Sequence, residues 1–248
     1  AHGCPVAKSA GLREKPRPMT DAQPQPERRR RQLYGRRPGP RMSARPAGLR
    51  QTLLAELTWK VGEDPFSQFP DTVRELWMEV GFGAGEHLVW QAQHHPDVGL
   101  IGAEPYEMGM AKVLTKLEEN PLNNVRLYEG VGREIVESLP DGCLSRFFLL
   151  FPDPWPKTRH HKRRFLQMEM LDLLARKLAV GAELRFATDD RTYLPWALER
   201  LMAHPAFKWT ASGPLEWKSR PADWPPTRYE TKAIKGPPTF LRFARRAN

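Results

Sequence analysis

Five short apolar segments alternate with segments of helical periodicity, and this alternation constrains the fold more than any other feature of the sequence. The apolar segments are expected to be strands, and they span residues 76–82, 98–104, 124–130, 145–151 and 182–189. The longest helical segment spans residues 162–178 and ends near Gly181. Such alternation predicts an α/β fold with a doubly wound, mostly parallel sheet and helices on both faces.

The N-terminal fifth of the chain has a different composition. Residues 1–50 carry 13 Lys or Arg and 3 Asp or Glu, whereas residues 51–248 carry 26 of each, so the net charge of +10 comes from the first segment. This segment also contains 8 prolines and too few large apolar residues to offset the entropy cost of ordering its backbone. We expect a disordered basic arm over residues 1–50, which either solubilises the protein or contacts nucleic acid, and one catalytic-size domain over residues 51–248.

Cysteine usage and hydropathy exclude several classes of protein. Cys4 and Cys143 are too few for a disulfide framework, and neither lies in a Cys/His spacing that would hold zinc. No apolar run approaches the roughly 18 to 20 residues that a membrane span requires, and the N-terminus lacks the apolar region of a signal peptide. We expect a soluble, cytoplasmic protein with no structural metal.

Three glycines, Gly81, Gly83 and Gly85, follow the first expected strand in the sequence EVGFGAGEH. Glycine allows a tight turn and a close approach of the backbone to a ligand, and the helix that follows offers free N–H groups. Glu104 ends the second expected strand about twenty residues later, where a ribose would present two hydroxyl groups. The pattern predicts a nucleoside-containing cofactor, and a tight connection without a ligand is the alternative.

Two carboxylates favour one cofactor over another. Glu86 stands where the dinucleotide fingerprint G-x-G-x-x-G requires its third glycine. The carboxylate of Glu79 would repel a pyrophosphate, but it would attract the ammonium and sulfonium groups of S-adenosylmethionine. We therefore expect S-adenosylmethionine rather than a nicotinamide dinucleotide. A capping or salt-bridged carboxylate is the alternative interpretation of Glu79.

A rigid acidic motif, FPDPWP, follows the fourth expected strand. The flanking prolines restrict the backbone around Asp153, so its carboxylate should be held in a narrow range of positions. Such a carboxylate could accept the N–H donors of a guanine's Watson–Crick edge, and Trp155 offers a face for stacking. The alternative is a proline-rich turn with an incidental aspartate.

A basic run, KTRHHKRR, occupies residues 157–164 near the start of an expected helix, where the helix dipole disfavours positive charge. We therefore expect the run to contact the phosphates of a polyanionic substrate. His160 and His161 are adjacent rather than one helical turn apart, so we interpret them as polar contacts and not as metal ligands.

Taken together, these motifs resemble the bacterial tRNA (guanine-N7)-methyltransferases over roughly residues 28–246, and the segments FPDPWPKTRHHKRR and TRYETKA are the most diagnostic. The resemblance implies a Rossmann-like methyltransferase fold, S-adenosylmethionine as methyl donor, and methylation of a guanine in the tRNA variable loop. It also implies tRNA as the partner. We expect a monomer rather than a homodimer.

The resemblance also implies roles for individual positions. Donor contacts are implied at Glu79, Glu104 and Asp153, the last with a catalytic role as well. Contacts to tRNA are implied at Lys157, Asp189, Thr227, Arg228, Tyr229 and Glu230. One position departs from the family pattern, because similar proteins usually carry an acidic residue near the adenine where this chain has Val131. Either backbone and apolar contacts hold the adenine there, or donor affinity is reduced.

We expect the enzyme to act mainly by positioning the guanine and the methyl donor, because guanine N7 has an available lone pair and no proton to remove. We expect Asp153 to orient the guanine and to stabilise its growing positive charge rather than to act as a base. Three alternatives remain open at this point: methylation of an exocyclic amine in RNA or DNA, a non-catalytic RNA-binding protein, and a nicotinamide-dependent oxidoreductase.

Overall fold

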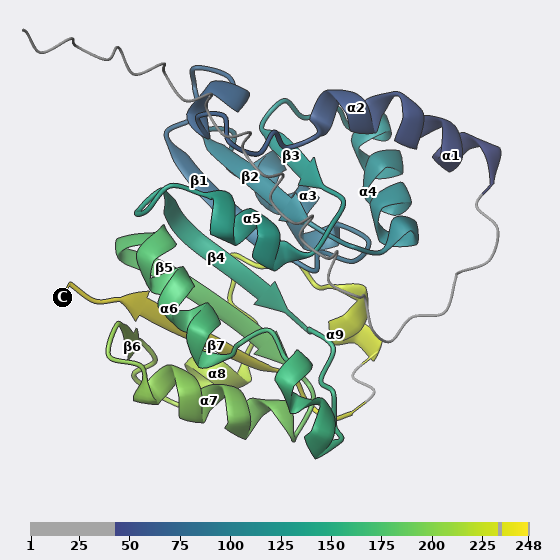
Figure 1. Ribbon diagram of the computed structural model, residues 1–248. Helices are drawn as coiled ribbons and strands as arrows, with labels where there is room; N and C mark the ends of the chain where they lie inside the picture. The colour runs from purple at the N-terminus through teal and green to yellow at the C-terminus, as the bar shows by residue number, and fades with distance from the viewer. Residues whose placement is uncertain (1–42, 233–234, 248) are drawn as a thin grey trace, which may run out of the picture. The chain divides into compact units, whose positions relative to one another are not determined.

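The computed structural model describes residues 43–232 and 235–247. Within them, the central element is a seven-stranded sheet with the order β3-β2-β1-β4-β5-β7-β6 (Figure 1). Strands β1 to β5 pair in parallel, whereas β7 runs antiparallel to both β5 and β6. The strands are β1 (Glu75–Val80), β2 (Val98–Ala103), β3 (Val125–Tyr128), β4 (Leu144–Leu150), β5 (Leu178–Thr188), β6 (Phe207–Trp209) and β7 (Thr239–Arg245).

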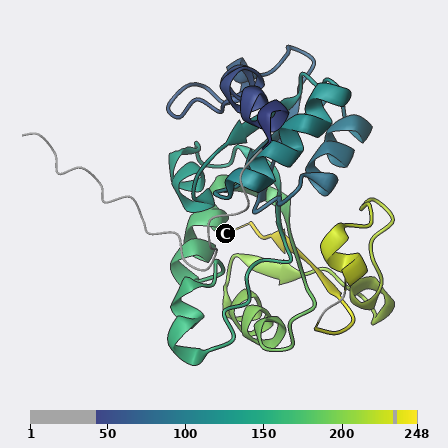
Figure 2. The same cartoon turned by 90° about the vertical axis from the view of Figure 1, so that its right-hand side faces the viewer.

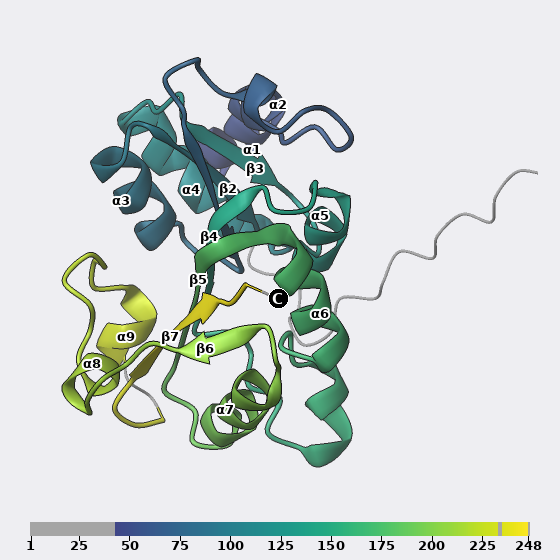
Figure 3. The same ribbon diagram turned by 90° about the vertical axis from the view of Figure 1, so that its left-hand side faces the viewer.

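Helices cover both faces of this sheet. They are α1 (Ala44–Gln51), α2 (Leu53–Leu57), α3 (Glu86–His94), α4 (Glu107–Glu119), α5 (Gly132–Ser138), α6 (Met168–Lys177), α7 (Tyr193–Ala203), α8 (Leu215–Lys218) and α9 (Arg228–Lys232), with 3-10 turns η1 (Phe66–Gln68) and η2 (Thr158–Arg163). Helices α5, α6 and α7 lie on one side of the sheet, and α3 and α4 lie on the other (Figure 3). The yellow segment with α8 and α9 lies on the side of α3 and α4 (Figures 2 and 3).

The two faces of the sheet form two apolar cores, because consecutive residues of a strand point to opposite faces. In β1, Met78 belongs to the core under α5, α6 and α7, and Trp77 to the core under α3 and α4. In β4, Phe147 and Phe148 divide in the same way. This two-sided burial explains the continuous apolar runs of the central strands.

The prediction of a doubly wound, mostly parallel sheet with helices on both faces is confirmed. The single long helix expected over residues 162–178 is wrong, because the chain is extended between η2 and α6. Arg164 turns inward there and Leu166 enters the core, while the side-chain amide of Gln167 donates to the carbonyl oxygens of His161 and Arg164. These tertiary contacts replace the continuation of the helix.

Part of the segment expected to be a disordered arm is helical. Helix α1 begins at Ala44, and it packs on α4 through the buried Leu49 and ion pairs of its arginines. The boundary expected at residue 50 therefore does not hold for residues 44–50. Residues 1–42 lie outside the described residues. Over the part of the chain that is described, no helix combines the length and the apolar character needed to cross a membrane.

Candidate active site

The register of the parallel strands brings the predicted site segments to one edge of the sheet. Val80 pairs with Ala103 and with Leu149, and Leu150 pairs with Ala187. The chain therefore leaves β1, β2, β4 and β5 at neighbouring points. The glycine turn, Glu104, the FPDPWP loop and Asp189 follow those points directly. In open parallel sheets this is the edge where ligands bind.

The glycine turn is tightly packed on one side and open on the other. Gly81, Gly83 and Gly85 all have left-handed backbone conformations, with φ of 74°, 60° and 74°. A Cβ at position 85 would lie 2.4 Å from Cγ2 of Val113 in α4, so only glycine fits there. A Cβ at position 81 would meet no atom within 4 Å. The backbone at Gly81 is thus accessible to a ligand.

Glu104 holds this turn against β2. Its side chain is buried, and its two carboxylate oxygens accept hydrogen bonds from the backbone N–H groups of Gly83, at 2.8 Å, and Tyr106, at 2.9 Å. A role in binding a ribose stays a prediction. The contacts show that the carboxylate shapes the turn in the structure.

Glu79 is buried and already has a partner, and its expected contact with the donor stays a prediction. Its carboxylate is 3% exposed and contacts Nδ1 of His87 at 2.8 Å. Nε2 of Gln91 donates to the carbonyl oxygen of Asp223 at 2.8 Å and lies 3.0 Å from Nε2 of His87. Because that amide nitrogen is a donor, Nε2 of His87 must accept and Nδ1 must carry the proton that Glu79 accepts. The geometry corresponds to the paired carboxylate that was the alternative interpretation of Glu79.

Val131 lies at the N-terminus of α5, beside the end of β3. The next residue, Gly132, is in close contact with β1, since a Cβ there would lie 2.4 Å from Cγ1 of Val80. The nearby carboxylate of Glu129 pairs with Arg50 of α1. The effect of Val131 on donor affinity stays a prediction.

The FPDPWP loop presents Asp153 to solvent on a strained backbone. Phe151 and Trp155, on either side of Asp153, have φ of 49° and 46°, which are left-handed values for residues with large side chains. The Trp155 ring contacts His160 edge to face, and the Arg163 guanidinium lies 4.9 Å from its centroid. Strain of this kind concentrates at functional sites and persists only where the surrounding contacts impose it.

The basic run divides into exposed and buried members. Lys157, Arg159 and Lys162 are exposed, as expected for phosphate contacts. Arg164 is 2% exposed, so the expectation that it contacts a polyanion is wrong. Desolvation and then the cations around it lower the pKa of His160.

The segment that carries the predicted tRNA contacts Thr227 to Glu230 lies against the glycine turn. The Cε2 atom of Tyr229 is 3.1 Å from the position that a Cβ of Gly83 would occupy. Hydroxyl Oγ1 of Thr227 accepts from the N–H of Glu230, and Glu230 pairs with Arg220. Between the turn and this segment is a pocket of about 140 Å³ lined by Gly83, Ala84, Glu86, Tyr106, Gly109, Lys112, Arg228 and Tyr229.

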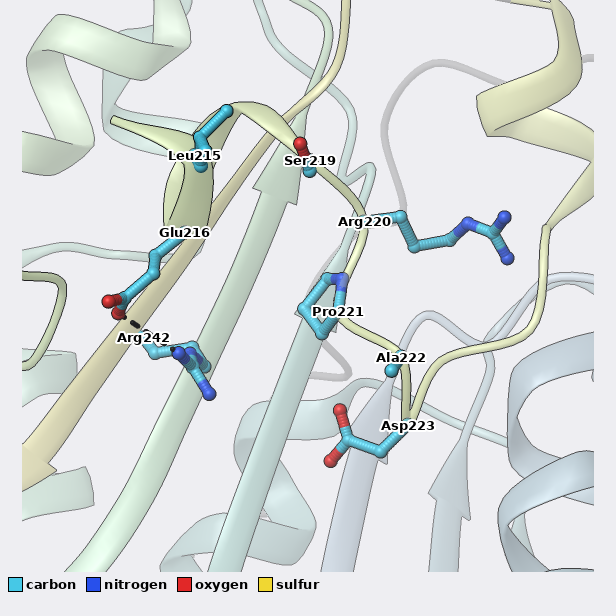
Figure 4. Close-up of a pocket in the computed structure, with 8 residues that line it drawn as sticks. All are labelled: Leu215, Glu216, Ser219, Arg220, Pro221, Ala222, Asp223 and Arg242. Carbon is cyan, nitrogen blue, oxygen red and sulfur yellow. Dashed lines mark hydrogen bonds and ion pairs between the residues drawn. The ribbon is translucent and has the colours of Figure 1, made fainter. Parts of the chain in front are cut away.

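A second pocket, of about 370 Å³, contains none of the predicted site residues. It is lined by Leu215, Glu216, Ser219, Arg220, Pro221, Ala222, Asp223 and Arg242 (Figure 4). Its charges are already paired: Arg242 contacts Glu216, Arg220 contacts Glu230, and Asp223 contacts Arg185. We therefore place the candidate active site at the smaller pocket and the neighbouring FPDPWP loop.

Three residues of this region were not identified from the sequence, namely His87, Gln91 and Trp224. They are buried, and Gln91 connects α3 to the segment that carries Asp223 and Trp224. Trp224 packs against the His87 ring, with centroids 5.7 Å apart. The only local signal was the position of His87 directly after the glycine turn.

Comparisons with known proteins identify the family. A family model described as "Putative methyltransferase" matches residues 73–240. A protein of Rhodospirillum rubrum named tRNA (guanine-N(7)-)-methyltransferase is 50% identical over 223 residues, covering 86% of this chain and 88% of the relative. A protein of Paramagnetospirillum magneticum with the same name is 47% identical and covers 88% of this chain and 94% of its own.

Solved structures support the fold. The crystal structure of the 16S rRNA methyltransferase KamB has a TM-score of 0.53 and 16% identity, and the match covers 76% of this chain and 96% of KamB. This likeness confirms the Rossmann-like methyltransferase fold, and the sequence relatives confirm the resemblance seen in the motifs. The chain belongs to the tRNA (guanine-N(7)-)-methyltransferase family.

Proposed function

We propose that this protein transfers the methyl group of S-adenosylmethionine to N7 of a guanine in the variable loop of tRNA. The observation that carries the proposal is the strand register, which brings the glycine turn, Glu104 and the strained FPDPWP loop to one edge of the sheet. The family relatives named for this activity support it. We further propose that the protein acts as a cytoplasmic monomer.

The glycine turn and its neighbours fit the donor. The accessible backbone at Gly81 and the N-terminus of α3 would receive the methionine part, and Glu104 and Val131 would lie beside the nucleoside. The pocket of about 140 Å³ is smaller than the several hundred cubic ångströms that ligand sites usually occupy. We infer that Tyr229, which rests on Gly83, shifts when the donor binds.

The residues of the chain contribute positioning and electrostatic stabilisation. Bound S-adenosylmethionine would supply an electrophilic methyl group that the N7 lone pair can attack directly. The exposed carboxylate of Asp153 would accept N–H groups of the guanine, and Trp155 would stack on a base. Methylation gives the guanine a positive charge, which the fixed carboxylate of Asp153 would stabilise.

Binding of the tRNA body would depend on positive charge. Lys157 is exposed directly before η2, Arg159 and Lys162 are exposed on η2, and Arg228 is exposed at the start of α9. Contacts from such cations to phosphates weaken steeply with salt. We propose the same salt dependence for phosphate contacts of the basic residues within 1–42, which lie outside the described residues. Removing residues 1–42 should weaken tRNA binding and reduce its salt dependence.

A comparison of two variants tests the role of Asp153. Asp153→Asn keeps the size of the side chain but loses its charge, so we expect tRNA affinity to be retained and kcat to fall by about 100-fold. Asp71→Asn, an exposed aspartate before β1, is the matched control and should leave kcat unchanged. Full turnover by Asp153→Asn would contradict the proposed role, and methylation of an exocyclic amine would contradict the proposed product.

A further inference from the structure

Arg164 is a fully buried cation that makes no ion pair. Its side chain is among the largest fully enclosed groups, and none of the ion pairs within residues 43–232 and 235–247 includes it. Its guanidinium lies 4.9 Å from the ring centroid of Tyr193 and 5.1 Å from that of Trp196. Burial lowers the pKa of Arg164. Asp190 acts on Arg164 electrostatically without a direct ion pair, and a buried guanidinium that lacks such a pair is costly, so a packing role alone does not explain it.

The hydrogen bonds of Arg164 join two loops of the active-site edge. Its Nε donates to the carbonyl oxygen of Pro154 at 2.8 Å, one residue after Asp153. Its Nη1 donates to the carbonyl oxygen of Thr192 at 3.2 Å, and its Nη2 donates to the hydroxyl of Thr192 at 2.9 Å. The planar fork of a guanidinium can reach both loops at once in fixed geometry, which a lysine ammonium cannot do.

The network continues to a third segment. The hydroxyl of Thr192 donates to Oδ1 of Asp190 at 2.6 Å, and the other oxygen, Oδ2, accepts from Nζ of Lys235 at 2.8 Å. The backbone N–H of Lys235 also donates to Asp189, a predicted tRNA contact, at 3.3 Å. Lys235 follows the segment of Thr227 to Glu230 in the chain. One hydrogen-bonded chain thus connects the Asp153 loop, the loop of residues 189–192 and Lys235.

We propose that Arg164 is a positioning residue for methyl transfer, which with Thr192, Asp190 and Lys235 holds the Asp153 loop in register with the rest of the tRNA site. The proposal rests on the proposed function and deepens it. Because the backbone beside Asp153 is strained at Phe151 and Trp155, it needs contacts that impose its conformation, and Arg164 supplies one at Pro154. Its neighbours Arg159 and Lys162 are exposed and belong to the RNA surface instead.

Steady-state kinetics of Arg164→Met and Arg164→Lys separate positioning from RNA contact. We expect Arg164→Met to lower kcat by about 100-fold, because a small misplacement of the reacting atoms has effects of that size. KM for tRNA and the salt dependence of tRNA binding should change little. Arg164→Lys should recover only part of kcat. A loss of tRNA affinity with kcat retained would make Arg164 an RNA contact and overturn the proposal.

Three further variants provide controls. Arg200→Met removes the other cation that lies on Trp196, at 3.6 Å, and touches no substrate segment, so it should leave kcat unchanged. Arg159→Met should instead reduce the slope of log affinity against log salt by about one. Thr192→Val should lower kcat and should be non-additive with Arg164→Met. Additive effects, or a kcat loss that only follows the folded fraction measured by circular dichroism, would overturn the proposal.

Hydrogen exchange tests the network without an activity assay. In Arg164→Met we expect faster exchange in peptides covering residues 151–157, 189–194 and 235–239, with the strands unaffected. Faster exchange confined to the neighbourhood of position 164 would contradict the network. If the wild-type protein yields no 7-methylguanosine, the proposed function fails while the exchange experiment still decides whether Arg164 couples the three segments.

Discussion

The buried pair of Glu79 and His87 gives a stability prediction that can be worked out from the structure. We consider His87→Phe, which keeps a ring of similar size against Phe148 and Trp224, whose centroids lie 4.6 and 5.7 Å from the imidazole. The substitution removes the N–H that Glu79 accepts and leaves a carboxylate that is only 3% exposed without that donor. A hydrogen bond to a buried charge contributes about 1.5 to 3 kcal/mol, and the desolvated charge adds to the loss. We expect a total cost of about 3 kcal/mol.

A double-mutant cycle isolates this interaction. In Glu79→Gln the charge is absent, so His87→Phe should cost only about 1 kcal/mol, and the coupling energy should be about 2 kcal/mol. Urea unfolding measures both values, provided that the m-value is unchanged. His204 and Asp172 form the matched control, because His204 is also buried but the Asp172 carboxylate is 72% exposed. That cycle should give a coupling below about 1 kcal/mol. Equal costs of His87→Phe in the wild-type and Glu79→Gln backgrounds would refute the hydrogen bond from His87 to a charged Glu79.

Three further predictions concern residues around the site. Gly85→Ala should cost about 2 to 4 kcal/mol by urea unfolding, because its φ is left-handed and its Cβ would collide with Val113; an unchanged midpoint would contradict this. Burial raises the pKa of Asp190, but Lys235 and hydrogen bonds from the following turn outweigh burial and lower that pKa from 3.8 to about 2. Its contribution of about 2 kcal/mol is therefore present above pH 4 and lost as the pH falls to 2, so Asp190→Asn should be destabilised relative to wild type at pH 6 but not at pH 2. An equal difference in unfolding free energy between Asp190→Asn and wild type at both pH values would contradict the lowered pKa of Asp190. Burial raises the pKa of Cys143 to about 11, so the folded protein should resist alkylation at this thiol at pH 8, and rapid labelling in a peptide map would contradict the burial.

The sequence predicted those features that depend on local pattern. The five parallel strands follow from apolar runs such as residues 145–151, and the glycine turn follows from the spacing of Gly81, Gly83 and Gly85. Strands that leave a parallel sheet at one edge also place Glu104 and Asp153 together without knowledge of any side-chain contact.

Contacts between distant residues could not be predicted in the same way. Periodicity favours a continuous helix through Arg164, and only its hydrogen bonds to Pro154 and Thr192 explain the interruption. The pairing of Glu79 depends on the direction of the His87 side chain, and Tyr229 reaches Gly83 from the far end of the chain. The sequence of strand β7 shows little apolar alternation, and the strand is positioned by its antiparallel pairing with β5.

The central claim is that this chain methylates N7 of a guanine in tRNA at the site of Asp153. The most direct test is mass-spectrometric nucleoside analysis of unmodified tRNA incubated with S-adenosylmethionine and either the intact protein or Asp153→Ala. We expect 7-methylguanosine with the intact protein, mapped to the variable loop, and almost none with the folded variant. No 7-methylguanosine from an intact protein that binds the donor, or equal amounts from both proteins, would contradict the claim.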